Sequence, residues 1–322
     1  TKKNSHLAEI VLLLICNALL FCSIGMNVVL FPARLMHYGI SESMIGFSFS
    51  VELIASIVIS FYIPHVTKKF KVIHTLIAMT LVYALSIILL PFYINFITWL
   101  ILIFVLGINL FGSMTITNSL YNQCLSNQKR GWYLSLMTIA ICTGLSIGPL
   151  IAGYGDPLHY KSFFISGAFA LLSAIPPFIL LKNKYEIPEH RHIKLLYFIK
   201  HSPVVFMAKF TQEFIVSGIL TLSVVFLIHH DHSLKQAGFA LSLFAGSAIL
   251  DLVIGYLADR YDKYKLVSIG VIGTLVGAII LFFQATNLQI VLATYFVLGV
   301  CVGLMHISLT SLLNNQFPKK SL

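Results

Sequence analysis

The chain has 322 residues, of which 58% are hydrophobic and only 10% are charged, with a formal net charge of +10. A soluble domain is about half apolar and a quarter charged, so this composition excludes an ordinary soluble protein. The basic residues are placed as they are in membrane proteins, as described below, and we therefore expect no nucleic-acid partner.

Apolar stretches of about 20 residues recur along the sequence, and each is long enough to cross a bilayer core of roughly 30 Å. Backbone polar groups must be satisfied internally in lipid, so these stretches are expected to be helices. We predict an all-α integral membrane protein with ten spans. Their ranges are 7–31, 43–64, 72–92, 97–120, 131–154, 161–181, 203–228, 236–257, 266–284 and 288–313.

The lysines and arginines indicate the orientation. With the N-terminus in the cytoplasm, only Arg34, Lys161 and Lys235 of the 21 fall on the outer side, and Lys209 lies inside a span. Positive residues gather in cytoplasmic loops, so we expect a cytoplasmic N-terminus. The compact loops favour a bacterial inner membrane. Arg34 is expected either to anchor the outer interface or to attract anions.

The first four spans contain four polar residues of interest: Asn17, Asn27, Glu52 and Asn109. An ionisable group in hydrocarbon costs about 3 kcal/mol, so such groups usually face a cavity or a partner. Glu52 has no charged neighbour in its own helix, and we expect it either to bind a proton or to pair with Lys209. We regard all four as candidates for substrate or proton binding.

The fifth span contains Gly144-x-x-x-Gly148-Pro149. Glycines permit close helix approach, and Pro149 removes a backbone hydrogen bond and can bend the helix, so Gly148 and Pro149 are gate candidates. The stretch 183–202 is expected to be a cytoplasmic linker with a short surface helix. Its His190-Arg191-His192 group is expected to be solvated rather than to bind metal.

The seventh span is the most informative, because Lys209, Glu213, Ser217 and Thr221 are four residues apart and share one helix face, with Gln212 beside them. One reading is an ion pair that only allows both charges to be buried. The other is a substrate or proton site whose pairing changes during function. We favour the second, because a static pair facing lipid would be an uncompensated cost.

Two later spans add three further candidates. Asp251 lies near the inner end of the eighth span with Gly255 one turn on, so a cytoplasmic gate is expected rather than substrate contact. His306 in the tenth span is either a hydrogen-bonded packing residue or, near neutral pH, a proton carrier.

The two halves of the sequence resemble each other. Phe104-Val105-Leu106-Gly107 recurs 192 residues later as Phe296-Val297-Leu298-Gly299, and His37 matches His229. At an offset of 194, Lys69-Phe70-Lys71-Val72 matches Lys263-Tyr264-Lys265-Leu266. Such a duplication in so apolar a chain indicates a two-halved transporter. We expect a six-helix bundle over 1–182, a linker over 183–202, and a second bundle over 203–322 that lacks the last two helices of a twelve-span parent. The alternative is a natural ten-span protein.

Residues 255–265, Gly-Tyr-Leu-Ala-Asp-Arg-Tyr-Asp-Lys-Tyr-Lys, closely resemble the loop motif of the major facilitator superfamily, with Asp262 in place of its second glycine. In the equivalent earlier loop, Pro64, His65 and Val66 are taken to stand where Ala258, Asp259 and Arg260 stand. The glycine motif of the fifth span is similar to one that antiporters of this family carry. The resemblance implies the family fold and a cytoplasmic gate in which Asp259 and Arg260 dock near Gly131.

These features predict a secondary active transporter that moves a small solute by alternating access around a site between the halves. Proton coupling is expected, with export slightly favoured. The alternatives are a non-transporting membrane receptor or assembly protein on the same fold, or a uniporter or importer of a sugar or organic anion. We expect a monomer that has no cofactor. It is not expected to be an enzyme, because no span has a metal-spaced His/Asp cluster or a serine set beside a base. No metal site is expected, because the five cysteines lack metal-binding spacing.

Overall fold

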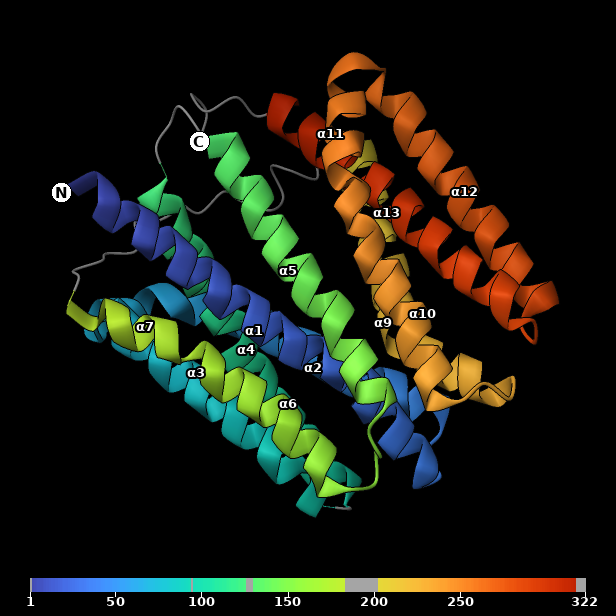
Figure 1. Ribbon diagram of the computed structural model, residues 1–322, viewed down its shortest axis with the longest axis horizontal. Helices are drawn as coiled ribbons and strands as arrows, with labels where there is room; N and C mark the ends of the chain where they lie inside the picture. The colour runs from blue at the N-terminus through green and yellow to red at the C-terminus, as the bar shows by residue number, and fades with distance from the viewer. Residues whose placement is uncertain (1, 94, 126–129, 183–201, 317–322) are drawn as a thin grey trace. The chain divides into compact units, whose positions relative to one another are not determined.

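The computed structural model describes residues 2–93, 95–125, 130–182 and 202–316 (Figure 1). These residues form helices and short connections, without a strand among them. The chain divides into two compact units, Thr1–Glu189 and His190–Leu322. The division falls within the predicted linker, whose surface helix and His190-Arg191-His192 group lie outside the described residues.

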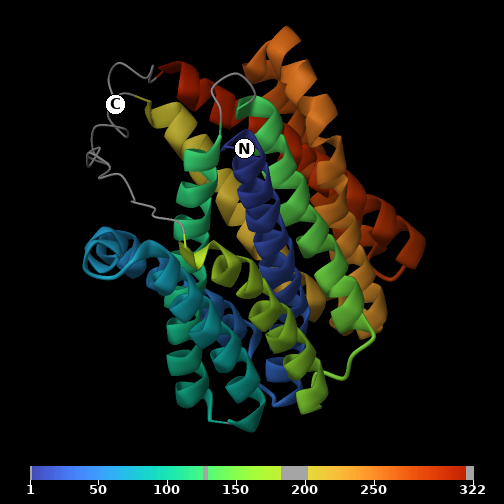
Figure 2. The ribbon, with the colours of Figure 1, turned by 60° about the vertical axis from the view of Figure 1, so that its left-hand side comes forward.

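The first unit is built around the contact of α1 with α5, which run side by side in Figures 1 and 2. Helix α4 packs against both α2 and α3, and α6 packs against α1 and α3. Its elements are α1 (Lys2–His37), α2 (Glu42–Lys69), α3 (Val72–Leu89), η1 (Leu90–Phe92), α4 (Phe96–Cys124), α5 (Arg130–Gly153), α6 (Tyr160–Ser173), α7 (Ile175–Ile179) and η3 (Leu180–Lys182).

The second unit is organised around α13, which packs against α12, α10, α11 and α9. Its elements are α9 (Pro203–His229), α10 (Leu234–Gly246), η4 (Ser247–Leu250), α11 (Asp251–Arg260), α12 (Lys263–Gln284) and α13 (Leu288–Gln316).

Nine helices in the described part of the chain are long and apolar enough to cross a membrane. They correspond to nine of the ten predicted spans, and the protein is an integral multi-pass membrane protein. The remaining prediction, 236–257, is met by α10, η4 and α11, because a 3₁₀ turn at Ser247–Leu250 interrupts the helix. The predicted sixth span contains a smaller break at Ala174, just before Pro176 and Pro177.

The internal repeat extends to backbone details. Gly39 and Asp231, 192 positions apart, have φ angles of 73° and 63° in the turns after α1 and α9. The Asn95 side chain caps the start of α4 and the Asn287 side chain accepts from the first amides of α13, again 192 positions apart. Matching turns and caps at one offset indicate a duplicated four-helix unit.

The predicted alignment at offset 194 is wrong. Helix α2 ends at Lys69 and α3 begins at Val72, whereas α11 ends at Arg260 and α12 begins at Lys263. The true offset at this turn is therefore 191. The counterparts of Ala258, Asp259 and Arg260 are Thr67, Lys68 and Lys69 rather than residues 64–66. Both loops contain a basic-aromatic-basic triplet, Lys69–Lys71 and Lys263–Lys265, and aligning the two triplets gives the offset of 194. The ends of the flanking helices do not allow this register.

The change of offset from 192 to 191 has a structural explanation in η4. Helix α2 has 28 residues, whereas Leu234–Arg260 has one fewer. Four 3₁₀ residues, at about 2.0 Å rise each, cover about 8 Å, and five α-helical residues at about 1.5 Å cover about 7.5 Å. The 3₁₀ turn thus restores the length that the missing residue would have supplied, and the turn after α11 keeps its place.

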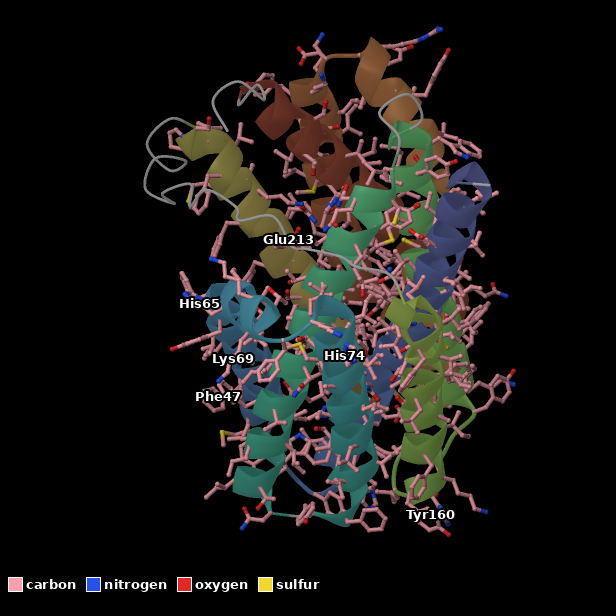
Figure 3. All side chains as sticks on the ribbon, turned by 90° about the vertical axis from the view of Figure 1, so that its left-hand side faces the viewer. Phe47, His65, Lys69, His74, Tyr160 and Glu213 are labelled. Carbon is pink, nitrogen blue, oxygen red and sulfur yellow. The ribbon has the colours of Figure 1, made fainter. Side chains whose placement is uncertain are left out.

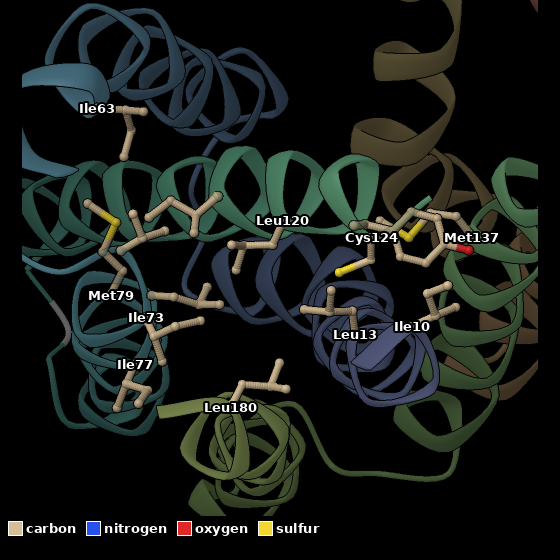
Figure 4. Close-up of a cluster of buried hydrophobic side chains, with 14 of the residues drawn as sticks. Ile10, Leu13, Ile63, Ile73, Ile77, Met79, Leu120, Cys124, Met137 and Leu180 are labelled. Carbon is tan, nitrogen blue, oxygen red and sulfur yellow. The ribbon is translucent and has the colours of Figure 1, made fainter. Parts of the chain in front are cut away.

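The first unit contains an apolar core where α1, α3, α4 and α5 meet, with Leu13, Leu76 and Leu120 fully buried (Figure 4). Large apolar side chains elsewhere are exposed instead, as at Ile97 in the first unit and Phe282 in the second. This pattern suits helices surrounded by lipid, where an apolar outer face has no cost.

Arg34 has neither of the roles predicted for it. Its guanidinium is buried and donates to the carbonyl oxygens of Pro91, Pro157 and Leu158, at 2.7–3.0 Å. It therefore joins the end of α1 to the α3–α4 and α5–α6 connections. An interface anchor or an anion attractor would need an accessible charge, and these carbonyls occupy most of its donors.

Candidate functional site

The candidate site is a cluster of four side chains in the second unit: Lys209, Gln212 and Glu213 on α9, and His306 on α13. Figure 3 shows Glu213 partway along α9. The Lys209 Nζ lies 2.8 Å from Glu213 Oε1, 2.6 Å from Gln212 Oε1 and 2.8 Å from His306 Nδ1. The i, i+4 spacing predicted the ion pair, and the packing of α9 on α13 adds His306.

Each hydrogen of the Lys209 ammonium has an acceptor in this arrangement. An ammonium has three donors and no acceptor, so the His306 Nδ1 contact requires a free lone pair on Nδ1. The imidazole is therefore neutral, with its hydrogen on Nε2. Glu213 Oε1 lies 3.8 Å from the same Nδ1. The cluster thus holds two partners, Lys209 and His306, that can compete for one carboxylate.

The cluster is partly accessible. Glu213 and His306 are about half exposed and Lys209 is a quarter exposed, whereas Gln212 is buried. At an offset of 192 the first unit has Asn17, Phe21 and Met114 in the places of Lys209, Glu213 and His306. The ionisable groups are therefore absent from the repeated scaffold, which points to a role other than holding the helices together.

Asn27 belongs to a buried polar network in the first unit. Its Nδ2 donates to the Tyr83 hydroxyl at 3.2 Å, and its Oδ1 accepts from Ser166 at 2.8 Å. Ser23 joins the network through Ser166 at 3.0 Å. Sequence reasoning missed Tyr83 and Ser166, although a tyrosine in the middle of the third span was an available signal. The network links α1, α3 and α6, so packing accounts for Asn27.

Glu52 lies on α2 where this helix crosses α4. A Cβ on Gly107 would be 2.8 Å from the Glu52 carbonyl oxygen and 3.1 Å from its Cγ. Glu52 thus takes part in the contact of α2 with α4 inside the first unit, and its predicted pairing with Lys209 stays a prediction.

The other two asparagines make local contacts. Asn17 is buried, and its Nδ2 lies 3.1 Å from the Leu13 carbonyl and 3.3 Å from the Met137 sulfur. Asn109 donates to the Val105 carbonyl of its own helix at 2.7 Å. Both sets of contacts lie inside the first unit.

The predicted gate residues are divided between the two units. Gly148 packs on α1, where a Cβ would meet the Cys22 carbonyl and Met26, and Pro149 lies against Gly25. Both residues therefore serve the α1–α5 contact inside the first unit. In the second unit the Arg260 guanidinium lies 4.4 Å from the centre of the Tyr256 ring.

The remaining gate candidates also belong to α11. Among the described residues, and apart from the backbone of its own helix, no atom lies within 4 Å of a Cβ built on Gly255. The side chains of Asp259 and Arg130 are outside the described set. One Asp251 oxygen is buried at the contact with α13.

The basic end of the first unit is visible in Figure 3, where His65, Lys69 and His74 surround the α2–α3 turn.

Comparison with known proteins agrees with this architecture. The sequence model of the Major Facilitator Superfamily matches residues 13–322 of the chain. Over 137 residues the chain is 28% identical to multidrug resistance protein 1 of Bacillus subtilis (strain 168). This aligned region covers 41% of the chain and 35% of that protein. The match thus spans about a third of the length of this relative.

Solved structures give the same picture. A mutant of the nucleoside transporter NupG superimposes with a TM-score of 0.82 at 13% identity, covering 97% of this chain and 84% of that one. A bacterial homolog to the human lysosomal transporter Spinster, inward-facing and occupied, gives 0.73 at 14% identity, covering 99% and 76%. At these identities the likeness shows the fold, an all-helical transporter fold of two related bundles.

Proposed function

Because the chain belongs to the Major Facilitator Superfamily and is a membrane transporter, we propose that it is a proton-coupled secondary active transporter of a small solute, working by alternating access. The observation that carries this proposal is the cluster of Lys209, Gln212, Glu213 and His306. It places an imidazole, a carboxylate and an amide on two helices of one bundle, each within hydrogen-bonding distance of the Lys209 ammonium.

A proton would change the pairing in this cluster. Protonated at Nδ1, His306 can no longer accept from Lys209 and instead repels it. The new N–H can donate to Glu213, whose Oε1 is 3.8 Å away. A small shift then exchanges the lysine–glutamate pair for a histidine–glutamate pair and releases the ammonium. Protonation of Glu213 itself would release Lys209 in the same way.

The released groups are what a solute would bind. Glu213 and His306 are half exposed, so a polar solute can reach them. A cluster with a carboxylate, an ammonium and an imidazole suits a zwitterion, an anion or a polar drug. The partial similarity to a multidrug resistance protein and the Gly144–Gly148–Pro149 motif favour export by antiport.

The gate is proposed to lie at the cytoplasmic end. Gly255, Asp259 and Arg260 belong to the family loop motif at 255–265, and Asp251 precedes it on α11. Gly148 and Pro149 would let α5 bend. The distribution of lysine and arginine supports a cytoplasmic N-terminus, and the short loops support a bacterial inner membrane and a monomer.

The test is flux into proteoliposomes that contain the purified protein, with an imposed pH gradient and a solute library that includes nucleosides and cationic drugs. We expect pH-driven accumulation of one solute class. Glu213→Gln should lose accumulation while solute exchange without a gradient continues. Glu42→Gln, at the exposed start of α2, is the matched control.

Three outcomes would contradict the proposal in distinct ways. Normal accumulation in Glu213→Gln would remove Glu213 as the coupling group. Accumulation that ignores the pH gradient would indicate a uniporter. Absence of flux for every solute, with the protein folded, would favour a receptor or assembly role.

A further inference from the structure

Asp251 is a partly buried acidic residue that does not belong to the cluster around Lys209. It follows η4 and begins α11, where this helix packs against α13. Its Oδ1 is buried and has no hydrogen-bond partner among the described residues. On the α13 side it lies against Gly303, where a Cβ would clash with Oδ1. The carboxyl therefore occupies space that only a glycine leaves open.

The duplicated unit shows how unusual this position is. In the first unit the corresponding stretch of α2 carries Ile59, which is buried in the apolar core. The counterpart of Ile59 in the second unit depends on the offset that is applied. The offset of 192 that holds before η4 gives Asp251, and the offset of 191 that holds after α11 gives Leu250. The position that an isoleucine fills in one bundle thus adjoins a carboxyl in the other. Packing alone would favour the apolar side chain, because an unpaired buried carboxylate oxygen is costly.

We propose that Asp251 is a second proton-binding site, separate from the Lys209 cluster, in which a proton on the carboxyl compensates for the missing hydrogen-bond partner. The site binds one proton from water as its carboxylate becomes a carboxylic acid, and it releases the proton when α11 moves away from α13. The proposal deepens the proton coupling proposed above, and its transport consequence rests on that function.

The surroundings favour a proton over a metal ion. The nearest side chain at Gly303 other than Asp251 is the Ile254 methyl group, 3.3 Å from the position of a Cβ. A hard cation needs several oxygen ligands, and the described residues contain no group of three histidine, cysteine or acidic side chains that could hold a metal. A proton needs only the carboxyl itself.

Few other titratable groups adjoin the site. On η4 there are none, and α13 contributes Tyr295, Cys301 and His306 among its described side chains. Tyr295 is buried, and Cys301 lies against Gly273 of α12. His306 lies one turn after Gly303 on α13, so movement of α13 at Asp251 would also move the acceptor of Lys209. This connection would couple the two proton sites.

The direct test is infrared difference spectroscopy of the purified protein in lipid, between acid and alkaline pH. We expect a C=O stretching band of a protonated carboxylic acid that is lost in Asp251→Asn. Gly303→Ala should shift or remove the same band although Asp251 is present, because its methyl group displaces Oδ1. Gly218→Ala is the matched control, since a Cβ there meets nothing within 4 Å.

A band unchanged in Asp251→Asn would overturn the proposal, as would a band that responds to sodium ions at constant pH. In a second measurement, the reversal potential of solute flux should show one proton fewer per solute in Asp251→Asn. If the protein carries no solute, the proposed function fails, but the infrared band still decides whether Asp251 binds a proton. If Gly303→Ala does not fold, Asp251→Asn alone decides.

Discussion

Ser247 of η4 lies against Gly299 of α13, so close that a Cβ on the glycine would clash with the serine hydroxyl and with the Phe244 carbonyl. The first unit has the same crossing between Gly107 of α4 and Ala55 of α2, where a Cβ would lie 2.9 Å from the alanine methyl. The two crossings are 192 positions apart on both helices. The repeated Phe-Val-Leu-Gly motif therefore lies at a helix crossing, and its glycine allows the two helices to approach closely.

Replacing either glycine should destabilise its own unit. Gly299→Ala and Gly107→Ala each force a methyl group into backbone, and overpacking of this kind costs about 1–3 kcal/mol. The gain in helix propensity, about 1 kcal/mol, offsets only part of it. Thermal unfolding in detergent should show a larger loss for Gly299→Ala, whose Cβ would be closer to its neighbours. Gly46→Ala, which meets nothing within 4 Å, should be neutral or stabilising.

The one-residue difference in η4 predicts an unusual tolerance to insertion. An alanine inserted after Ala248 should turn η4 into ordinary α-helix and give the element the 28 residues of α2. The turn between α11 and α12 would then keep its place. The same insertion after Val224 in α9 should rotate everything after it by about 100° and unfold the unit. Yield of monodisperse protein measures both, and equal losses would contradict this account of η4.

Removal of one charge from the cluster should be worse than removal of both. Lys209→Met leaves Glu213 without its ammonium, and Glu213→Gln leaves Lys209 with a weaker acceptor, whereas the double variant has neither charge. We expect the double variant to unfold at a temperature closer to that of the native protein than Lys209→Met does. All three should lose pH-driven accumulation. Additive shifts in unfolding temperature would mean that the two charges do not interact.

How far the sequence predicts this structure depends on the distance between partners. The spans, the repeat and the Lys209–Glu213 pair follow from apolar length, self-similarity and helical spacing, which are all local. His306 lies 97 residues from Lys209, and only helix packing brings them together. Arg34 was misread for the same reason, since its partners are carbonyl oxygens 57 and more residues away and carry no side-chain signal. The break at η4 was missed because one absent residue leaves the apolar pattern intact.

His306→Gln separates hydrogen bonding from proton binding. A glutamine side chain keeps an oxygen that can accept from Lys209, but it cannot take up a proton near neutral pH. We expect solute exchange in this variant to continue and to lose its response to acidification, because Lys209 is no longer displaced. Exchange rates measured in proteoliposomes over a range of pH provide the test. A pH response equal to that of the native protein would leave Glu213 or Asp251 as the proton site.

Arg34→Lys should destabilise the first unit although it conserves the charge. One guanidinium nitrogen, Nη1, donates to the carbonyl oxygens of Pro157 and Leu158, and the other, Nη2, donates to that of Pro91. A lysine has one nitrogen on a flexible stem and cannot bridge both connections. Each lost hydrogen bond to a charged group costs about 1.5–3 kcal/mol, and the abandoned carbonyls are left without this donor.

The measurement is thermal unfolding of the purified variant, with hydrogen exchange to locate the change. Lys161→Arg, an exposed substitution at the start of α6, is the control for a change between the two basic residues. Faster exchange should appear after α3 and between α5 and α6, where the three carbonyls lie, and should spare the second unit. If Arg34→Lys unfolds like the native protein, the carbonyl contacts contribute little, and an accessible role for this charge returns to consideration.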